Sequence, residues 1–243
     1  MMWMVNNMKI KMVLFDLDGT LLPMDMDTFI KAYFSGIAKK LHPYAYEPEK
    51  LIKAIWDGTY KMIKNDGTRT NEEAFWEYFA TVFGNDARKD EPKFESYYIE
   101  NFDNVKNVCG FNPKASEVIK LIKDLGLRVA LATNPIFPSI ATEKRISWAG
   151  LSYNDFELFT TYENCRYCKP NLNYYLDILD KLEVKAEECL MVGNDVDDDM
   201  ITTKLGMKVF LLTDCLINNN NKDISFYPNG NFDDLIKYIR SIS

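Results

Sequence analysis

Long hydrophobic runs are missing from this chain of 243 residues. No apolar stretch approaches the roughly 20 residues that a membrane-spanning helix needs. The first residues, "MMWMVNNMKIKMVLF", do not read as a signal peptide, because Asn and Lys interrupt the apolar positions and no small-residue cleavage site follows. We therefore expect a cytoplasmic protein that has no membrane as a partner.

Histidine, cysteine and basic residues are also few. The chain has one histidine, His42, and five cysteines, an odd number that argues against a framework of disulfides. Cys165 and Cys168 have the spacing of a zinc-binding pair, but no second close pair of ligands accompanies them, which favours two incidental cysteines. The 29 Lys and Arg against 36 Asp and Glu give a net charge of −7. This balance disfavours nucleic acid as a partner but allows a small phosphorylated substrate.

Four short apolar runs predict buried strands, and they lie at 10–15, 128–133, 188–193 and 208–213. Each of the last three follows a segment with apolar residues at helical spacing, and these segments lie at 114–126, 171–184 and 198–206. Because strands that alternate with helices form parallel sheets, we predict an α/β fold with a Rossmann-like parallel sheet. The run "FELFTT" at 156–161 is a candidate for one more strand.

The stretch between the first and second predicted strands has a different character. Residues 25–105 contain no strand-like run, and apolar residues recur there at helical spacing in four segments punctuated by Pro and Gly. We predict an all-α insert over this stretch. The α/β part is then discontinuous and covers residues 1–24 and 106–243.

Polar and charged side chains follow the predicted strands where these end. Ligands of open parallel sheets bind at the carboxyl ends of the strands, so we expect these side chains to converge. Several carboxylates in one site repel one another unless a cation neutralises them, and oxygen ligands favour Mg²⁺. The polar members of the converging set are Asp16, Asp18, Thr20, Thr133, Asn134, Lys169, Asn194, Asp195, Asp197, Asp198 and Asp199.

The segment "DLDGT", at 16–20, contains two aspartates, Asp16 and Asp18. Both cannot use their side chains to bind a metal and also take part in the reaction, so we expect them to have different roles. The simplest division has Asp16 attack phosphorus to give an aspartyl-phosphate, while Asp18 protonates the leaving oxygen and later deprotonates water. Lys169 would offset the charge of Asp16 and the phosphoryl group. The hydroxyl of Thr133 and backbone N–H groups near Asn134 would hold the phosphoryl oxygens.

Four motifs in this order resemble the haloacid dehalogenase superfamily, in its phosphatase branch: "DLDGT" (16–20), "LATN" (131–134), "CKP" (168–170) and "VGNDVDDD" (192–199). The resemblance covers roughly residues 8–24 and 106–215. It implies that Asp16 is the nucleophile, that Asp18 is the acid/base and holds Mg²⁺ through its backbone carbonyl, and that residues 25–105 form a helical cap. Since the dehalogenases lack an aspartate at the second position, Asp18 points to phosphoryl chemistry.

The last motif departs from the family pattern, which commonly has Gly-Asp where this chain has Gly193 and Asn194. Either Asn194 binds the metal through its amide oxygen or Asp195 does so as the charged ligand, and charge favours Asp195. Asp199 is expected to support the metal site or to orient Lys169, and Asp198 is an equally good counterpart by position.

The function that these residues predict is Mg²⁺-dependent hydrolysis of a small phosphomonoester. Two alternatives stay open. A phosphosugar mutase would use the same residues and return the phosphoryl group to a sugar. A non-catalytic, receiver-like module would be phosphorylated on Asp16 and signal through the insert. The sequence leaves open the identity of the phosphomonoester, the insert residues that select it and the oligomeric state.

Overall fold

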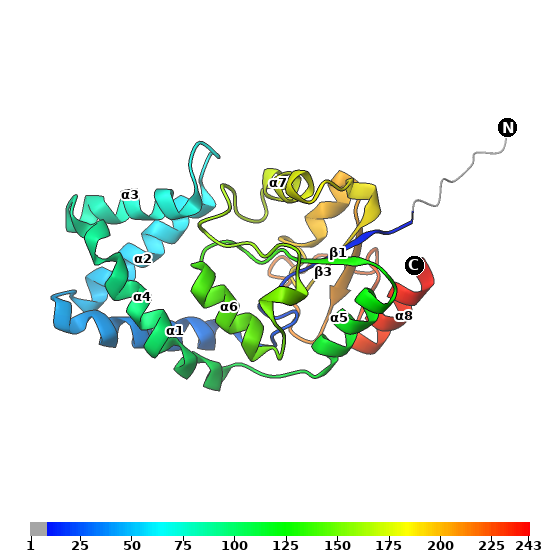
Figure 1. The fold of residues 1–243 in the computed structure, drawn as a ribbon, viewed down its shortest axis with the longest axis horizontal. Helices are drawn as coiled ribbons and strands as arrows, with labels where there is room; N and C mark the ends of the chain where they lie inside the picture. Colours follow the sequence, from blue (N-terminus) through cyan, green and yellow to red (C-terminus); the bar gives the residue numbers. More distant parts are fainter. Residues whose placement is uncertain (1–8) are drawn as a thin grey trace.

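One parallel sheet forms the centre of the α/β part. The computed structural model describes residues 9–243, and its strands follow the order β2–β1–β3–β4–β5 with every neighbouring pair parallel (Figure 1). The strands are β1 (Met12–Phe15), β2 (Arg128–Leu131), β3 (Cys189–Gly193), β4 (Lys208–Leu212) and β5 (Asn229–Gly230). The first four lie within the four apolar runs of the sequence. The predicted α/β fold with a Rossmann-like parallel sheet is thus confirmed.

Both faces of the sheet are covered by helices. Along β1, Val13 and Phe15 belong to one hydrophobic cluster and Leu14 to another, as the two-residue period of a strand requires. The covering helices are α5 (Lys114–Asp124) and α8 (Phe232–Ile242) on the first face and α7 (Leu172–Leu182) on the second. Figure 1 shows α5 and α8 side by side on one side of the sheet and α7 on the other.

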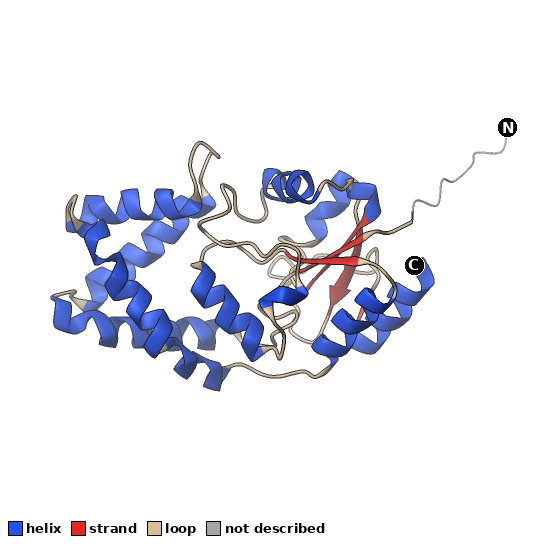
Figure 2. Ribbon diagram, viewed as in Figure 1, coloured by secondary structure: helices blue, strands red, loops and turns tan. Residues whose placement is uncertain are grey.

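The insert is all-helical and lies at the other end of the molecule from α5 and α8 (Figure 2). Its helices begin at capping residues: Asp25 accepts the backbone N–H of Thr28 at 2.9 Å, and Thr70 forms a capping box with Glu73. The α-helices are α1 (Met26–Leu41), α2 (Pro48–Ile63), α3 (Asn71–Phe83) and α4 (Glu91–Glu100). The 3₁₀ helices are η1 (His42–Tyr44), η2 (Ala87–Asp90) and η3 (Phe102–Val108).

The chain enters and leaves the insert at one place. Met24 and Cys109 form an antiparallel bridge, and the N–H of Gly110 donates to the carbonyl of Pro23 at 2.7 Å. The boundary predicted after residue 105 falls inside η3, a few residues before this bridge. The hydrophobic cluster on the α5 face of the sheet continues into the insert, so the two parts share one core.

Two predicted elements differ from the structure. The run 156–161 is not a strand: it lies beside β2, but only Leu131 and Phe159 complete a bridge, which is too short a pairing. The predicted helix at 198–206 is the 3₁₀ helix η6 (Met200–Leu205), because the hydroxyls of Thr202 and Thr203 bond carbonyls three residues back.

Seven of the described elements lie outside the segments predicted from the sequence. They are β5, α6 (Ser139–Trp148), α8 and the short 3₁₀ helices η1, η2, η4 (Tyr153–Asp155) and η5 (Ala186–Glu188). Within residues 9–243, no helix is both long and apolar enough to cross a membrane. Residues 1–8, on which the signal-peptide and domain predictions partly rest, lie outside the described residues.

Candidate active site

A cavity of about 350 Å³ opens between the carboxyl ends of the strands and the insert. Nine of the eleven side chains of the converging set line its sheet end, including both members of each open pair. They come from four separate loops, which follow β1, β2 and β3 and precede α7. Thr20 and Asp197 do not line the cavity: Thr20 contacts Asp16 and Asn194, and Asp197 pairs with Lys222.

The sheet end of the cavity, lined by five aspartates and Lys169, is its charged end, and Lys169 lies at the centre of it. It is 3% exposed, and its Nζ lies 2.8 Å from Asp16 Oδ1 and 2.6 Å from Asp199 Oδ1. Burial alone would lower the pKa of Lys169, but the carboxylates of Asp16 and Asp199 raise it well above its usual value. Burial raises the pKa of Asp199, and the Lys169 ammonium opposes that rise. Lys169 is thus held charged between two carboxylates.

Thr20 links the first motif to the last. Its Oγ1 lies 3.0 Å from both Asp16 Oδ2 and Asn194 Oδ1, so one hydroxyl hydrogen is shared by two acceptors. The amide of Asn194 is oriented by its Nδ2, which donates to the carbonyl of Cys215 at 2.6 Å. A Cβ on Gly19 would lie 2.3 Å from Asn194 Nδ2, which explains a glycine at this φ of +81°. Oxygens of Asp16 and Asn194 therefore face the same point.

The aspartates after β3 make different contacts. Asp195 Oδ1 accepts the backbone N–H groups of Asp197 at 2.7 Å and Asp198 at 2.9 Å, which closes the turn. The N–H of Asp195 donates to Asp199 Oδ2 at 3.1 Å. Burial raises the pKa of Asp198 to about 6, although Lys169 lowers it. Of the two candidates for orienting Lys169, Asp199 makes the direct contact.

The loop after β2 is held by buried hydroxyls. The carbonyl of Thr133 accepts from Thr160 Oγ1 at 2.6 Å and from the Tyr174 hydroxyl at 2.8 Å. Asn134 Oδ1 accepts the backbone N–H of Lys169 at 3.2 Å, which ties this loop to the loop before α7. Both predicted phosphate-binding residues are positioned by bonds to distant segments.

Arg145 is a site residue that the motifs did not reveal. It is fully buried on α6 and forms an ion pair with Asp18. Its guanidinium also bonds Thr142 Oγ1 at 3.2 Å and lies 4.5 Å from the ring centre of Phe137. The sequence carried no signal for it, because its burial on the face of α6 that Ala141 shares became visible only in the structure.

Asp18 keeps one oxygen free despite this pair. Its Oδ2 accepts from Arg145, while Oδ1 is buried without a hydrogen-bond partner among the described residues. Burial raises the pKa of Asp18 to about 6, and the Arg145 guanidinium acts in the opposite direction. Asp18 lines the cavity, although Oδ1 itself has almost no exposed surface, and an unpaired buried oxygen of this kind needs an explanation such as a role in the reaction.

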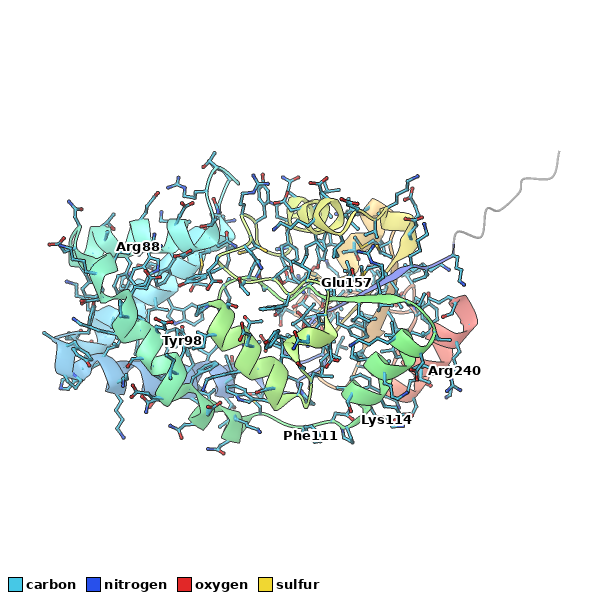
Figure 3. All side chains as sticks on the ribbon, viewed as in Figure 1. Arg88, Tyr98, Phe111, Lys114, Glu157 and Arg240 are labelled. Atoms are coloured by element: carbon cyan, nitrogen blue, oxygen red, sulfur yellow. The ribbon has the colours of Figure 1, made fainter. Side chains whose placement is uncertain are left out.

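The insert end of the cavity is aromatic. Its lining side chains include Tyr33, Phe34, Trp56, Phe75, Trp76, Phe94 and Tyr98. Phe137, Pro138 and Tyr162 from the α/β part add to the same wall. Figure 3 places Tyr98 on α4 in the insert, whereas Lys114, Glu157 and Arg240 lie in the α/β part. Apolar and charged walls thus face each other across one cavity.

Asn71 fastens the insert to the α/β part. This fully buried residue at the start of α3 donates its Nδ2 toward the carbonyl of Pro135 at 3.1 Å and the Sγ of Cys168 at 3.3 Å. Its backbone N–H donates to the carbonyl of Cys165 at 2.8 Å. The two cysteines of "CRYC" therefore lie at this joint, and burial raises the pKa of both thiols, that of Cys165 to about 12.

The charges on the wall suit a hard cation. Five carboxylates line the cavity, and they are Asp16, Asp18, Asp195, Asp198 and Asp199. Lys169 is the one Lys, Arg or His on the described wall, with Arg145 buried behind it. Within residues 9–243, no three His, Cys, Asp or Glu side chains converge closely enough to hold a metal alone. A Mg²⁺ here would need amide or backbone oxygens, water and substrate oxygens, which is its usual mode of binding.

Sequence comparisons point to a family of hydrolases. Residues 10–204 match the model of the haloacid dehalogenase-like hydrolase family. The chain is 28% identical over 100 residues to the "Putative phosphatase YhcW" of Bacillus subtilis, which covers 41% of this chain and 44% of that protein. It is 24% identical over 191 residues to "Pyrophosphatase PpaX" of Bacillus cereus, which covers 79% of this chain and 77% of that protein. The first match spans less than half the length of its relative.

Solved structures share the fold at low sequence identity. A 2-haloacid dehalogenase from Pseudomonas syringae superimposes with a TM-score of 0.63 at 17% identity and covers 96% of this chain and 100% of its own. A HAD phosphatase from Thermococcus onnurineus gives 0.58 at 17% identity, with 95% and 98% covered. A "putative beta-phosphoglucomutase" from Thermotoga maritima gives 0.56 at 17% identity, with 96% and 100% covered. At these identities the likeness shows the fold, which the three proteins share with this chain.

Proposed function

The chain belongs to the haloacid dehalogenase-like hydrolases, and from this premise we propose that it is a Mg²⁺-dependent phosphatase of small phosphomonoesters. The observation that carries the proposal is the setting of Asp16. This carboxylate lies at the charged end of the cavity, with Oδ1 on Lys169 and Oδ2 on Thr20, and Asp18 stands two residues further along. The names of the curated relatives, a putative phosphatase and a pyrophosphatase, support the same class of reaction.

In the first step Asp16 attacks phosphorus. The new bond joins a carboxylate oxygen to phosphorus, and the bond between phosphorus and the leaving oxygen breaks. Asp18, which lines the cavity and has one carboxyl oxygen without a hydrogen-bond partner among the described residues, would give a proton to that leaving oxygen. The product alcohol departs and leaves an aspartyl-phosphate on Asp16.

In the second step water releases the phosphate. Asp18, now ionised, takes a proton from water as the water oxygen attacks phosphorus, and the acyl phosphate bond to Asp16 breaks. Lys169, the Thr133 hydroxyl and backbone N–H groups near Asn134 would hold the phosphoryl oxygens while charge moves. Arg145 would position Asp18 by binding its other oxygen.

Mg²⁺ would be held by Asp16, by the backbone carbonyl of Asp18 and by Asn194 or Asp195. When bound, it neutralises charge on the phosphoryl oxygens. We favour Asn194 over Asp195, the reverse of the order that charge alone suggests. Asn194 Oδ1 faces Asp16 across Thr20, whereas Asp195 Oδ1 already accepts two backbone N–H groups. In Asn194→Ala the Mg²⁺ concentration for half-maximal activity should rise more than in Asp195→Asn, and the opposite order would favour Asp195.

Residues 25–105 would act as a cap that covers the site and selects the substrate. We expect the reaction to take place in the cytoplasm on a small phosphorylated metabolite. A phosphosugar mutase fits less well, because a sugar needs many polar partners and the insert wall is largely apolar. A receiver-like module fits poorly with Asp18, which would hydrolyse a lasting signal. Asp18 also disfavours a dehalogenase, by the resemblance described above.

The test is phosphate release from p-nitrophenyl phosphate and a panel of phosphomonoesters, with Mg²⁺ and with EDTA. We expect release that EDTA stops and that Asp16→Asn abolishes. Asp197→Asn is the matched control, because Asp197 belongs to the same acidic run but is half-exposed and pairs with Lys222. Full activity in Asp16→Asn would overturn the assignment of the nucleophile. Isomer formation without free phosphate would instead identify a mutase.

A further inference from the structure

Among residues 9–243, no Asp, Glu, Lys, Arg or His of the insert lies on the cavity wall opposite Asp16. The insert residues on it are aromatic or aliphatic apart from the hydroxyls of Tyr33, Thr59 and Tyr98 and the indole of Trp76. No Lys, Arg or His of the described insert lines the cavity. A substrate that reaches from Asp16 toward the insert would therefore place its alcohol portion against rings and neutral hydroxyls.

Charge on that portion of the substrate would have no partner. A buried charge that leaves water without a counter-ion loses more solvation than apolar contacts return. The carboxylates at the sheet end would also repel a second anionic group, and Lys169 is already shared by Asp16 and Asp199. The cavity thus accommodates one phosphoryl group and rejects a second anion.

The few polar groups on this wall suit a neutral substrate. The hydroxyls of Tyr33 and Tyr98 lie 2.9 Å apart, and since one bond uses one hydrogen, the pair keeps one O–H to donate. Trp76 adds its ring to the wall, while its Nε1 has almost no exposed surface and lies close to the Tyr162 hydroxyl. Neutral donors of this kind recognise a carbonyl, ether or hydroxyl oxygen.

Resting on the phosphatase proposed above, we propose that the substrate is a phosphomonoester whose alcohol portion is uncharged and mainly apolar, with an aromatic ring as the best fit. Aromatic rings pack favourably against one another edge to face or offset-stacked, so this wall would have affinity for an aromatic ring of the substrate. A volume of about 350 Å³ lies at the lower end of the range for small-molecule pockets, so one phosphoryl group and one ring system are the appropriate size. Pyrophosphate, bisphosphates and phosphorylated carboxylic acids would be poor substrates.

The experiment compares substrates that differ in one charge. The kcat/KM for phosphate release is measured with phenyl phosphate, 4-carbamoylphenyl phosphate, 4-carboxyphenyl phosphate and pyrophosphate. The 4-carboxyphenyl and 4-carbamoylphenyl esters have nearly the same shape and differ in charge. Phenyl phosphate has a poorer leaving group and 4-carbamoylphenyl phosphate a better one than the carboxylate, so leaving-group reactivity cannot explain a slower carboxylate. We expect the neutral esters to exceed the carboxylate by roughly 30-fold or more, the size expected for an unpaired buried charge. Equal or better rates for the carboxylate or for pyrophosphate would overturn the inference.

A matched pair of variants locates the effect on the wall. Trp56 and Tyr60 are both half-exposed on α2, but only Trp56 lines the cavity. Trp56→Arg should raise kcat/KM for the carboxylate relative to the carboxamide by about tenfold, and Tyr60→Arg should leave the ratio as in the wild type. Thr59→Lys supplies a second cation on this wall should Trp56→Arg fail to fold. An unchanged ratio in both wall variants would contradict the inference.

Binding separates this inference from the phosphatase proposal. Phenylphosphonate and 4-carboxyphenylphosphonate cannot be hydrolysed at the phosphorus–carbon bond, and their Kd values can be measured by calorimetry with Mg²⁺ present. A Kd at least roughly 30-fold lower for phenylphosphonate would support the apolar site even if no ester were cleaved. An absence of cleavage would then contradict only the proposed phosphatase. Equal Kd values alongside good turnover would overturn only the inference.

Discussion

The sheet end and the insert end of the cavity hold their side chains in different ways. At the sheet end, Asp16, Lys169 and Asp199 are fixed by hydrogen bonds of 2.6–2.8 Å between segments distant in the chain. At the insert end, rings are held mainly by apolar packing, as Phe75 is against Phe79 behind the wall, with centroids 5.6 Å apart. Directional bonds tolerate little change, whereas apolar packing accepts substitutions that keep volume. For the proposed reaction, we therefore expect the charged end to tolerate few substitutions and the insert wall to tolerate more, with changes in selectivity.

The largest effect is expected from breaking the charged end with Lys169→Met. Turnover should fall by about 10²–10³-fold because the phosphoryl group loses a fixed cation. The free energy of unfolding should fall by about 3–5 kcal/mol, since Asp16 and Asp199 stay buried without their partner. Phosphate release and urea unfolding measure the two losses.

Two controls separate the stability and activity of Lys169. Lys222→Met removes a half-exposed partner of Asp197 and should cost under about 1 kcal/mol. Adding Asp199→Asn to Lys169→Met should recover part of the stability but not the turnover. Wild-type turnover in folded Lys169→Met would show that the charged end is not the reaction centre.

Arg145 tests whether the charged end extends behind the cavity wall. Arg145→Met should lower kcat by about 10²-fold with little change in KM, because Asp18 loses the group that positions it. The free energy of unfolding should fall by about 3 kcal/mol. Arg145→Lys should recover part of both quantities. Steady-state kinetics with phenyl phosphate measure the change in kcat and KM. If only the free energy of unfolding falls, Arg145 has a structural role alone.

Phe79→Ala tests the aromatic end without touching the cavity wall. Phe79 is fully buried and packs against Phe75, Trp76 and Phe94. Its truncation should lower the free energy of unfolding by about 3 kcal/mol through the cavity that it leaves, while kcat changes little. Urea unfolding measures this. Phe83→Ala, a less buried ring in the same cluster, should cost less, and a loss of kcat that exceeds the loss of stability would make the aromatic end part of the reaction centre.

The smallest effect is expected at Asp103, which joins the two parts by accepting from Trp148 Nε1 at 3.0 Å and from Lys144. Burial raises the pKa of Asp103, but its bonds to Lys144 and Trp148 outweigh this and lower it below the usual value. A carboxyl with a lowered folded pKa stabilises the fold above its unfolded pKa of about 3.9, and this contribution is lost as the pH falls through the folded pKa.

Asp103→Asn should therefore cost about 0.5 kcal/mol near neutral pH, after allowance for solvent screening. The difference from the wild type should vanish as the pH falls from about 5 to below 3. Urea unfolding across this range measures it. Asp124→Asn removes an exposed carboxyl paired with Lys120 and serves as the control. A deficit that grows toward acid pH would contradict the direction of the Asp103 shift.

Much of the sheet end could be predicted because its signals are local. Asp16 and Asp18 stand two residues apart after a strand, and Lys169 directly precedes a proline and a helix. The carboxyl ends of parallel strands must share one edge, so residues far apart in the chain could be placed together without coordinates. The same rule applied to Thr133 and Asn134, which line the cavity as expected.

Other features depend on contacts that no local pattern encodes. Arg145 lies 127 positions from Asp18, on a helix that was not predicted. The run 156–161 has strand-like residues but a single completed bridge. At 198–206 the threonine hydroxyls bond the backbone and favour a 3₁₀ helix over the α-helix that the apolar spacing suggested. In each case a tertiary or side-chain contact decided against the periodicity.

The sequence by itself determined four of the five described strands, the helical insert and most of the residues at the sheet edge. Periodicity and chain order suffice for these, because the spacing of apolar residues along a segment shows whether one face of a helix or of a strand is buried. Only the tertiary structure decided which oxygen faces Asp16, which cation pairs with Asp18 and which rings line the cavity. Those choices depend on angles and distances between segments more than a hundred residues apart, where a shift of one side chain changes the partner.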